Sequence, residues 1–323
     1  MNAEPLSALR AALGVEVPLL GAPMARIAGA RLATTVTDAG GLGFVGGGYG
    51  DAEWLDRELG AAEPSRVGVG LITWRLDEQP HVLDSALEHG PRAVWLSYGD
   101  PAPYIPRIHD AGAAAVCQVL DLPSAAAARR AGADVLVAQG SEAGGHGRPG
   151  RGLLTLLPAI VQCARGTPVV GAGGIATGRQ LAACWTLGAA GAALGTRLYA
   201  THEATDTPGA KQRLVDAAGG DTLHTTVFDL LRGPPWPDGY TGRAIANDVT
   251  RRWQGRETEL APVLARERQR YQRRAAADDL ATRVVWAGEA LDLIHALEPA
   301  ADVIRTIHRD ARRAYGLIAE SPA

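Results

Sequence analysis

The residues best suited to chemistry lie together in the segment 139–149, which follows the apolar run 134–138. Within this segment Gln139, Ser141, Glu142, His146 and Arg148 supply hydrogen-bond donors, acceptors and a titratable imidazole. Four of its eleven residues are glycine, which lets the backbone adopt positive φ and lie close to a ligand. A histidine held at the end of a buried strand is suited to moving protons at a bound substrate. The same composition is also typical of a glycine-rich surface connection.

Two glycine-rich turns later in the chain are suited to binding a phosphate. Gly173 and Gly174 follow one apolar run, and Gly195 and Thr196 follow the next. Backbone N–H groups in such turns, each leading into a helix, favour an anion. A phosphate site fits a sugar-phosphate isomerase as well as a flavin enzyme, and tight packing could also require these glycines.

The basic residues and cysteines exclude two classes of chemistry. Lys211 is the only lysine among 32 basic residues, and it lies in a polar stretch, whereas Schiff-base chemistry needs a desolvated lysine. Cys117, Cys163 and Cys184 are widely spaced and form no CxxC or metal-ligand pattern. We therefore expect no lysine-dependent aldolase, no disulfide framework and no metal site, and we interpret the cysteines as small buried apolar residues.

The bulk composition is that of an ordinary globular enzyme. The chain has 323 residues, of which 46% are hydrophobic, and a formal net charge of −3. Because lysine and arginine are scattered, a nucleic-acid partner is not expected. The first residues lack the basic start and long apolar core of a signal peptide, and no apolar run reaches membrane-spanning length. We expect a cytoplasmic protein that acts on a small molecule, and a homo-oligomer is compatible with the sequence.

From residue 17 to about 200, short apolar runs alternate with segments of helical periodicity. The predicted strands are 17–20, 43–45, 67–72, 93–96, 115–119, 134–138, 168–170 and 192–194. Predicted helices between them include 30–39, 80–89, 124–131 and 179–187. Strict alternation indicates parallel pairing, and eight such units favour a closed (β/α)8 barrel, the TIM barrel, over an open sheet. Residues 1–220 are expected to form this barrel.

In such a barrel the chemistry lies at the carboxyl ends of the strands. The predicted first strand ends at residues 21–24, the third at Thr73 and Trp74, and the fifth at Gln118. The sixth ends in the segment around His146, and the last two end in the glycine-rich turns. We therefore expect all of these groups to meet at one mouth.

Residues 221–323 differ in character from the barrel. Residues 233–239 are rich in proline and glycine and cannot be helical, residues 251–279 are strongly charged and indicate a solvated helix, and 300–317 have helical periodicity. We interpret this part as a mostly helical extension that packs on the barrel and closes one side of its mouth, with a stabilising role for most of it.

With these features assembled, the chain resembles the nitronate monooxygenase family, FMN-dependent TIM barrels related to the flavin enoyl-carrier-protein reductases. The matching segments are 21–24, 40–43, 138–146, 172–176 and 194–197. The likeness continues at 241–244 and 285–288. The combination in this order is specific for the superfamily and much less specific for the substrate.

The resemblance implies roles for individual residues. His146 would stand over the flavin as the catalytic histidine. It would take a proton from the carbon next to a nitro group, or hydrogen-bond an anionic nitronate. The implied FMN-binding residues are Ala22, Pro23, Met24, Gln118, Gln139, Gly144, Gly145, Gly173, Gly174, Gly195 and Thr196. The implied reaction is oxidation of a small alkyl nitronate by O2 to a carbonyl compound and nitrite.

The predicted third strand departs from the family pattern. Many members carry Gly-Val-Asn there, with the asparagine near the flavin, whereas this chain has glycine at position 70. Thr73 or Trp74 could replace the missing contact, although Trp74 could equally serve packing. Together with Ser141 and Trp286 these two residues form the predicted substrate contacts.

Two other functions remain open at this point. One keeps FMN but makes the protein an NAD(P)H-dependent reductase of a quinone or an enoyl thioester. The chain has no dinucleotide-binding fingerprint of the separate βαβ kind, so NAD(P)H would have to bind at the barrel mouth. The other is a non-redox, phosphate-binding barrel.

Overall fold

The eight predicted strands form one closed parallel barrel, which confirms the predicted fold class. The computed structural model describes residues 3–233 and 236–319. The barrel strands are β1 (Leu19–Gly21), β2 (Leu42–Gly46), β3 (Gly68–Ile72), β4 (Ala93–Ser97), β5 (Ala114–Val119), β6 (Val135–Gln139), β8 (Val169–Ala172) and β9 (Gly191–Leu194). They pair in chain order, and β9 pairs with β1 to close the barrel.

Successive strand residues supply two different apolar cores, because side chains along a strand alternate between its faces. Leu20 and Trp95 belong to the cluster inside the barrel, whereas their neighbours Leu19 and Val94 belong to the cluster between the sheet and the helices. Leu9 of α1 (Ala3–Leu13) joins the inner cluster. The barrel is therefore filled with side chains, and α1 covers its amino end.

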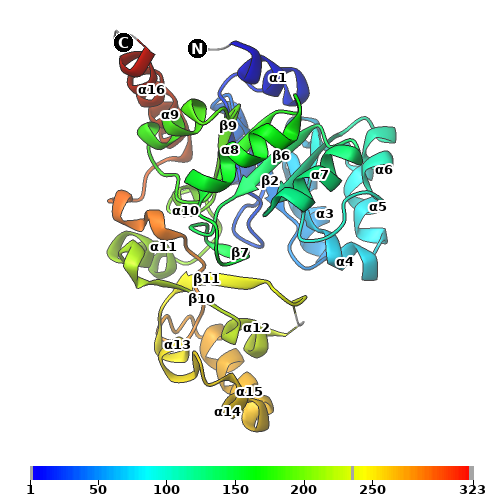
Figure 1. The fold of residues 1–323 in the computed structure, drawn as a ribbon. Coiled ribbons are helices and arrows are strands. Elements are labelled where there is room, and N and C mark those ends of the chain that lie inside the picture. Colours follow the sequence, from blue (N-terminus) through cyan, green and yellow to red (C-terminus); the bar gives the residue numbers. More distant parts are fainter. Residues whose placement is uncertain (1–2, 234–235, 320–323) are drawn as a thin grey trace.

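Helices connect the strands and cover the outside of the barrel (Figure 1). They are α2 (Ala30–Asp38), α3 (Ala52–Ala61), α4 (Thr73–Glu78), α5 (His81–Glu88), α6 (Ile105–Asp110), α7 (Leu122–Arg130), α8 (Leu153–Ala164), α9 (Gly178–Thr186), α10 (Thr196–Tyr199) and α11 (Pro208–Asp216), with a 3-10 turn η1 (Pro64–Arg66). Asp121 caps α7 by accepting the N–H of Ser124 at 2.8 Å, and the Ser124 hydroxyl accepts the N–H of Asp121 in return.

The remaining part of the chain contains strands as well as helices. Its elements are η2 (Gly219–Asp221), β10 (Thr222–Thr225), α12 (Val227–Arg232), β11 (Thr241–Ile245), α13 (Asp248–Trp253), α14 (Glu257–Leu260), η3 (Ala261–Val263), α15 (Leu264–Ala276), η4 (Glu289–Leu293) and α16 (Ala300–Ala319). The helix expected over 251–279 is divided into three, with turns at Gly255 and Pro262. The interspersed charges of this segment indicated a helix, but they did not indicate where the helix would break.

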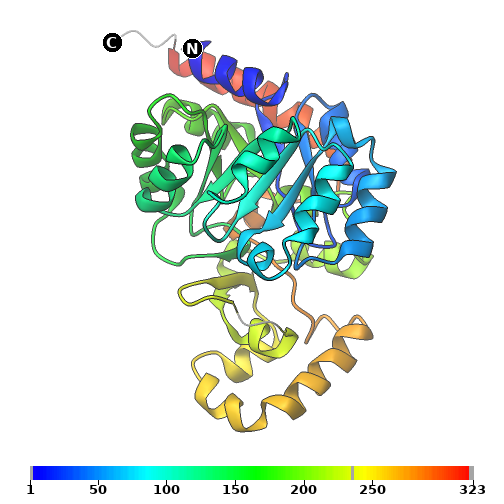
Figure 2. The same cartoon turned by 90° about the vertical axis from the view of Figure 1, so that its right-hand side faces the viewer.

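A small sheet joins this part to the barrel. β7 (Gly145–Gly147), which lies inside the segment that was expected to be a loop, pairs antiparallel with β11, and β11 pairs with β10. His146 is opposite Gly242 in this sheet. In Figure 1 the three strands lie between the barrel and the group formed by α12 to α15. Figure 2 shows α1 and α16 at the opposite end of the molecule, where α16 packs on α9.

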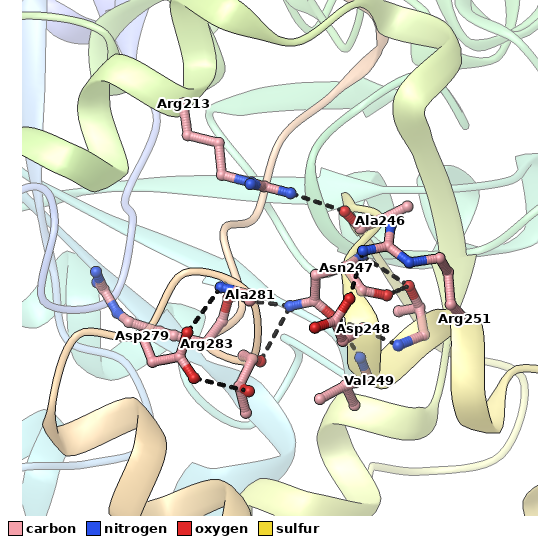
Figure 3. A network of polar contacts seen from close by, with 11 residues as sticks. Arg213, Ala246, Asn247, Asp248, Val249, Arg251, Asp279, Ala281 and Arg283 are labelled. Atoms are coloured by element: carbon pink, nitrogen blue, oxygen red, sulfur yellow. Dashed lines mark hydrogen bonds and ion pairs between the residues drawn. The ribbon is translucent and has the colours of Figure 1, made fainter.

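A polar network fixes the segment that returns from α15 towards the barrel mouth (Figure 3). The side-chain amide of Asn247 donates to the carbonyls of Thr282, at 3.0 Å, and Arg283, at 3.2 Å. Arg213 of α11 donates to the neighbouring carbonyl of Ala246 at 2.9 Å. Because both sides are held, the segment after Arg283 leaves in a defined direction and reaches the mouth.

Across the described residues, no helix has both the length and the apolar character needed to cross a membrane.

Candidate active site

A cavity of about 470 Å³ opens at the carboxyl ends of the barrel strands. It gathers residues from most strand ends and from the C-terminal part of the chain. The sequence-predicted residues that border it are Ala22, Pro23, Met24, Gln118, Gln139, Gly144, Gly145, His146, Gly173, Gly174, Gly195, Thr196 and Trp286. Its volume is in the range of small-molecule sites.

The predicted substrate residues Thr73, Trp74 and Ser141 are not among the described residues that border the cavity. Thr73 is buried at the start of α4, and Trp74 packs edge-on against Trp236, with ring centroids 5.6 Å apart. The carbonyl of Ser141 accepts hydrogen bonds from His224 and from Arg243, each at 3.0 Å. These residues support the walls because the chain turns away from the mouth at both places.

Main-chain contacts hold His146 in place. Its carbonyl accepts the phenol hydroxyl of Tyr98 at 2.8 Å and the side-chain amide of Gln139 at 2.9 Å. Gln118 donates in turn to the amide oxygen of Gln139, and the Ser97 hydroxyl donates to Gln118 at 3.2 Å. Both predicted glutamines therefore lie in the cavity wall and position the histidine strand.

Among the described residues, the imidazole of His146 has one polar partner and two aromatic neighbours. Nε2 lies 2.8 Å from Oδ1 of Asp229, and the two side chains are only 8% and 7% exposed. The ring stacks on Trp236, with a centroid separation of 3.6 Å and an interplanar angle of 8°, and Trp286 lies at 4.9 Å. The histidine therefore has a fixed ring plane at the edge of the cavity.

Burial determines the protonation of this histidine. Loss of solvent lowers the pKa of His146 below its ordinary value of 6.5, Asp229 raises it, and the positive charge of Arg232 lowers it. The net change in pKa is downward. At neutral pH the imidazole is therefore uncharged and is available as a base.

Arg232 provides positive charge at the mouth. Its guanidinium lies 5.7 Å from the ring centre of Trp286 and 5.9 Å from that of Tyr49, and it borders the cavity. Among the described residues it has no carboxylate within ion-pair distance. The indole of Trp236 donates to the Tyr49 hydroxyl at 2.9 Å, which holds this aromatic wall together. An anion bound here would meet an uncommitted cation.

The predicted phosphate turn has the backbone conformation that glycine permits. Gly173 and Gly174 have φ of +101° and +68°, so their N–H groups point along directions that ordinary strand residues do not use. The nearby carboxylate of Glu142 accepts the N–H of Leu153 at 2.8 Å, at the start of α8. Because that negative charge is directed to α8, the turn itself remains suited to an anion.

The segment returning from Arg283 completes the cavity. The N–H of Gly288 donates to the Thr196 hydroxyl oxygen at 2.9 Å, and the N–H of Glu289 donates to the carbonyl of Glu142 at 2.9 Å. Trp286 lies against Gly242, where a Cβ atom would come within 2.3 Å of the indole. Residues about 90 positions after the end of β9 therefore line the mouth.

The departure at the third strand has a packing cause. A Cβ atom at Gly70 would lie 2.1 Å from Cβ of Pro23. An asparagine at position 70 is therefore incompatible with Pro23 in its present place.

Sequence reasoning missed Asp229, Arg232 and Trp236, which contact or surround His146. They lie in a short helix and a proline-rich segment that carry no catalytic pattern, and only the β7–β11–β10 sheet brings them to the site. Tyr98 had a usable signal, because it lies two residues after the predicted strand 93–96.

Comparisons with known proteins agree with this geometry. A family model described as nitronate monooxygenase matches residues 76–310. A nitronate monooxygenase from Neurospora crassa is 32% identical, over 91% of this chain and 89% of its own. FabK from Thermotoga maritima superposes with a TM-score of 0.84 and 27% identity, covering 96% and 97% of the two chains. A nitroalkane oxidase from Streptomyces ansochromogenes gives a TM-score of 0.81 and 26% identity, covering 97% and 100%.

Proposed function

Because the chain belongs to the nitronate monooxygenase family, we propose that it is an FMN-dependent oxidoreductase that oxidises small alkyl nitronates with O2 to a carbonyl compound and nitrite. The observation that carries this proposal is the position of His146. Its buried, neutral imidazole borders the same cavity as the Gly173–Gly174 turn. A proton-moving group and an anion-binding turn in one cavity suit a phosphate-bearing cofactor and an acidic carbon substrate.

The residues present fit FMN. The main chain of residues 22–24 would lie along the ring system, and the side-chain amides of Gln118 and Gln139 would bind the ring or the ribityl chain. Gly173, Gly174, Gly195 and Thr196 would hold the phosphate. When bound, the flavin supplies the electron transfer between substrate and O2, while the protein binds and orients.

His146 would act on the substrate in one of two ways. With a neutral nitroalkane, its uncharged imidazole would remove the proton on the carbon next to the nitro group, leaving a nitronate. With a nitronate, which has already lost that proton, the protonated ring would donate to a negatively charged oxygen. The lowered pKa of His146 favours the first role at neutral pH and makes the second stronger in acid.

Arg232 would orient the negative end of the substrate. Its guanidinium lies at the same mouth as the imidazole and has no carboxylate partner among the described residues. The rings of Tyr49, Tyr98, Trp236 and Trp286 form the rest of the wall and would exclude water from a small apolar body. This combination suits a short alkyl chain that ends in an anion.

An aerobic nitrite assay tests the function, and an anaerobic assay with NAD(P)H together with reconstitution with FMN separates it from its alternatives. Nitrite released from propionate 3-nitronate without NAD(P)H supports the proposal. Rapid bleaching of the flavin by NAD(P)H in the absence of O2, with no nitrite formed, would instead indicate a reductase of a quinone or enoyl thioester. A colourless protein that cannot be reconstituted with FMN would leave only the non-redox, phosphate-binding barrel.

A further inference from the structure

We propose that Asp229 is a positioning residue that fixes the tautomer of His146, so that Nε2 carries the proton and Nδ1 is the atom that faces the substrate. The catalytic consequence rests on the proposed function. The tautomer itself does not, because it follows from the contact between the two side chains.

The direction of the hydrogen bond follows from the chemistry of the pair. An ionised carboxylate can only accept, so the Nε2 atom that lies 2.8 Å from Oδ1 of Asp229 must be the donor. In the neutral imidazole the proton is then on Nε2 and the lone pair is on Nδ1. Nδ1 has no hydrogen-bond partner among the described residues. It is also not among the polar side-chain atoms of these residues that are fully buried without a partner. It therefore remains open to the cavity that the ring borders.

Asp229 is committed to this one contact. Its second oxygen, Oδ2, is buried and has no hydrogen-bond partner among the described residues. A buried carboxylate oxygen without a partner costs free energy, so the side chain is not explained by stability alone. His146 is the one described side chain that hydrogen-bonds to this carboxylate.

The small sheet sets the geometry of the pair. β7 carries His146, and β10 leads through Thr225 directly into α12, where Asp229 lies in the first turn. The Thr225 hydroxyl accepts the N–H of Val227 at 3.0 Å, which fixes the start of that helix. Both partners therefore belong to one hydrogen-bonded unit, which sets their separation.

The charged and titratable groups near the imidazole leave Asp229 as its anionic partner. Arg232, which lies on α12 together with Asp229, is a cation and lowers the pKa of His146. Tyr98 contacts the main chain of His146, and burial raises the pKa of its phenol to about 12, so it stays neutral. The two rings stacked or tilted against His146 are indoles and carry no charge.

The test reads the tautomer directly in the full-length, FMN-loaded protein labelled with ¹⁵N-histidine. Long-range ¹H–¹⁵N spectra distinguish a protonated from a bare ring nitrogen, and the signals lost in His146→Gln identify the residue. At neutral pH we expect a protonated Nε2 and a bare Nδ1. A bare Nε2 in the wild-type protein would overturn the proposal even if the nitronate assay also failed.

Asp229→Asn supplies the second readout, because an amide of the same shape can either accept from Nε2 or donate to it. We expect the other tautomer to appear, and the pH midpoint of kcat/KM for a neutral nitroalkane to move to lower pH. kcat/KM itself should fall on the order of a hundredfold while the flavin stays bound. Asp229→Glu should recover part of the rate, and Asp302→Asn on α16 is the matched control. An Asp229→Asn protein with the wild-type tautomer and pH midpoint would show that Asp229 only fills space.

Discussion

Gly144 and Gly288 lie so close together that neither can carry a side chain. A Cβ atom on Gly144 would lie 2.5 Å from the nitrogen of Gly288, and one on Gly288 would lie 2.8 Å from the nitrogen of Gly144. This contact joins the segment that carries His146 to the segment that carries Trp286. The two walls of the cavity are therefore held together by main chain against main chain.

Gly288→Ala should loosen this junction. Its Cβ atom would also lie 2.5 Å from the carbonyl oxygen of Glu142, so backbone must shift, and the free energy of unfolding should fall by about 1–3 kcal/mol. Urea unfolding of the flavin-loaded protein measures this change. Gly60→Ala is the control, because a Cβ atom there meets nothing within 4 Å in helix α3 and should be neutral or slightly stabilising. Equal unfolding curves for the two variants would show that the backbone at this junction can shift without a loss of stability.

Gly174→Asp should weaken FMN binding by placing bulk and negative charge against the phosphate. The substitution also strains a backbone with φ of +68°, so it needs a control with the same strain. Gly90→Asp supplies it, since φ is +64° there and the site is open and distant from the cavity. Fluorescence titration with FMN should separate the two variants. Equal affinities would place the phosphate elsewhere.

Arg232→Gln should raise KM for an anionic nitronate more than it lowers kcat, because a cation at the mouth binds charge already present in the substrate. The effect should shrink as salt is added. Arg31→Gln, on the exposed face of α2, is the control for a change in net charge. Unaltered KM in Arg232→Gln would remove this residue from substrate binding.

The pH dependence has a defined sign. Because burial lowers the pKa of His146 below 6.5, the base form persists into mild acid. As the pH falls, kcat/KM for a neutral nitroalkane should therefore stay level until the pH reaches this lowered pKa. It should then fall about tenfold per pH unit, since the protonated imidazole cannot accept a proton. Arg232→Gln removes a charge that lowers this pKa, so the midpoint should move to higher pH. A wild-type midpoint above 6.5 would contradict the burial of a neutral imidazole.

The sequence predicted the barrel well because its signals are local. Each strand is a short apolar run, and some connecting helices begin at a recognisable capping residue, as α7 does at Asp121 and α9 does at Thr177. The glycine turn at 173–174 and the histidine segment could be assigned to one mouth because carboxyl ends of parallel strands must meet. The roles given to these residues remain predictions.

The rest of the site depends on pairing that has no local signature. β7 has three residues inside a glycine-rich segment, and its partner β11 contains Gly242, so neither shows the alternation of a strand. Asp229 reaches His146 across 83 positions of sequence through this sheet. Trp74 and Ser141, which were predicted to contact substrate, are not among the described residues that border the cavity, and their contact with substrate stays a prediction.

Nitrite release from propionate 3-nitronate, measured in air without NAD(P)H, tests the central claim most directly when wild type and His146→Ala are compared at equal flavin content. We expect the wild-type protein to release nitrite, and His146→Ala to retain FMN but turn over more slowly, because the protonated imidazole can no longer donate to the nitronate oxygen. Equal rates for the two proteins, or no nitrite from a wild type that is saturated with FMN, would contradict nitronate oxidation at His146.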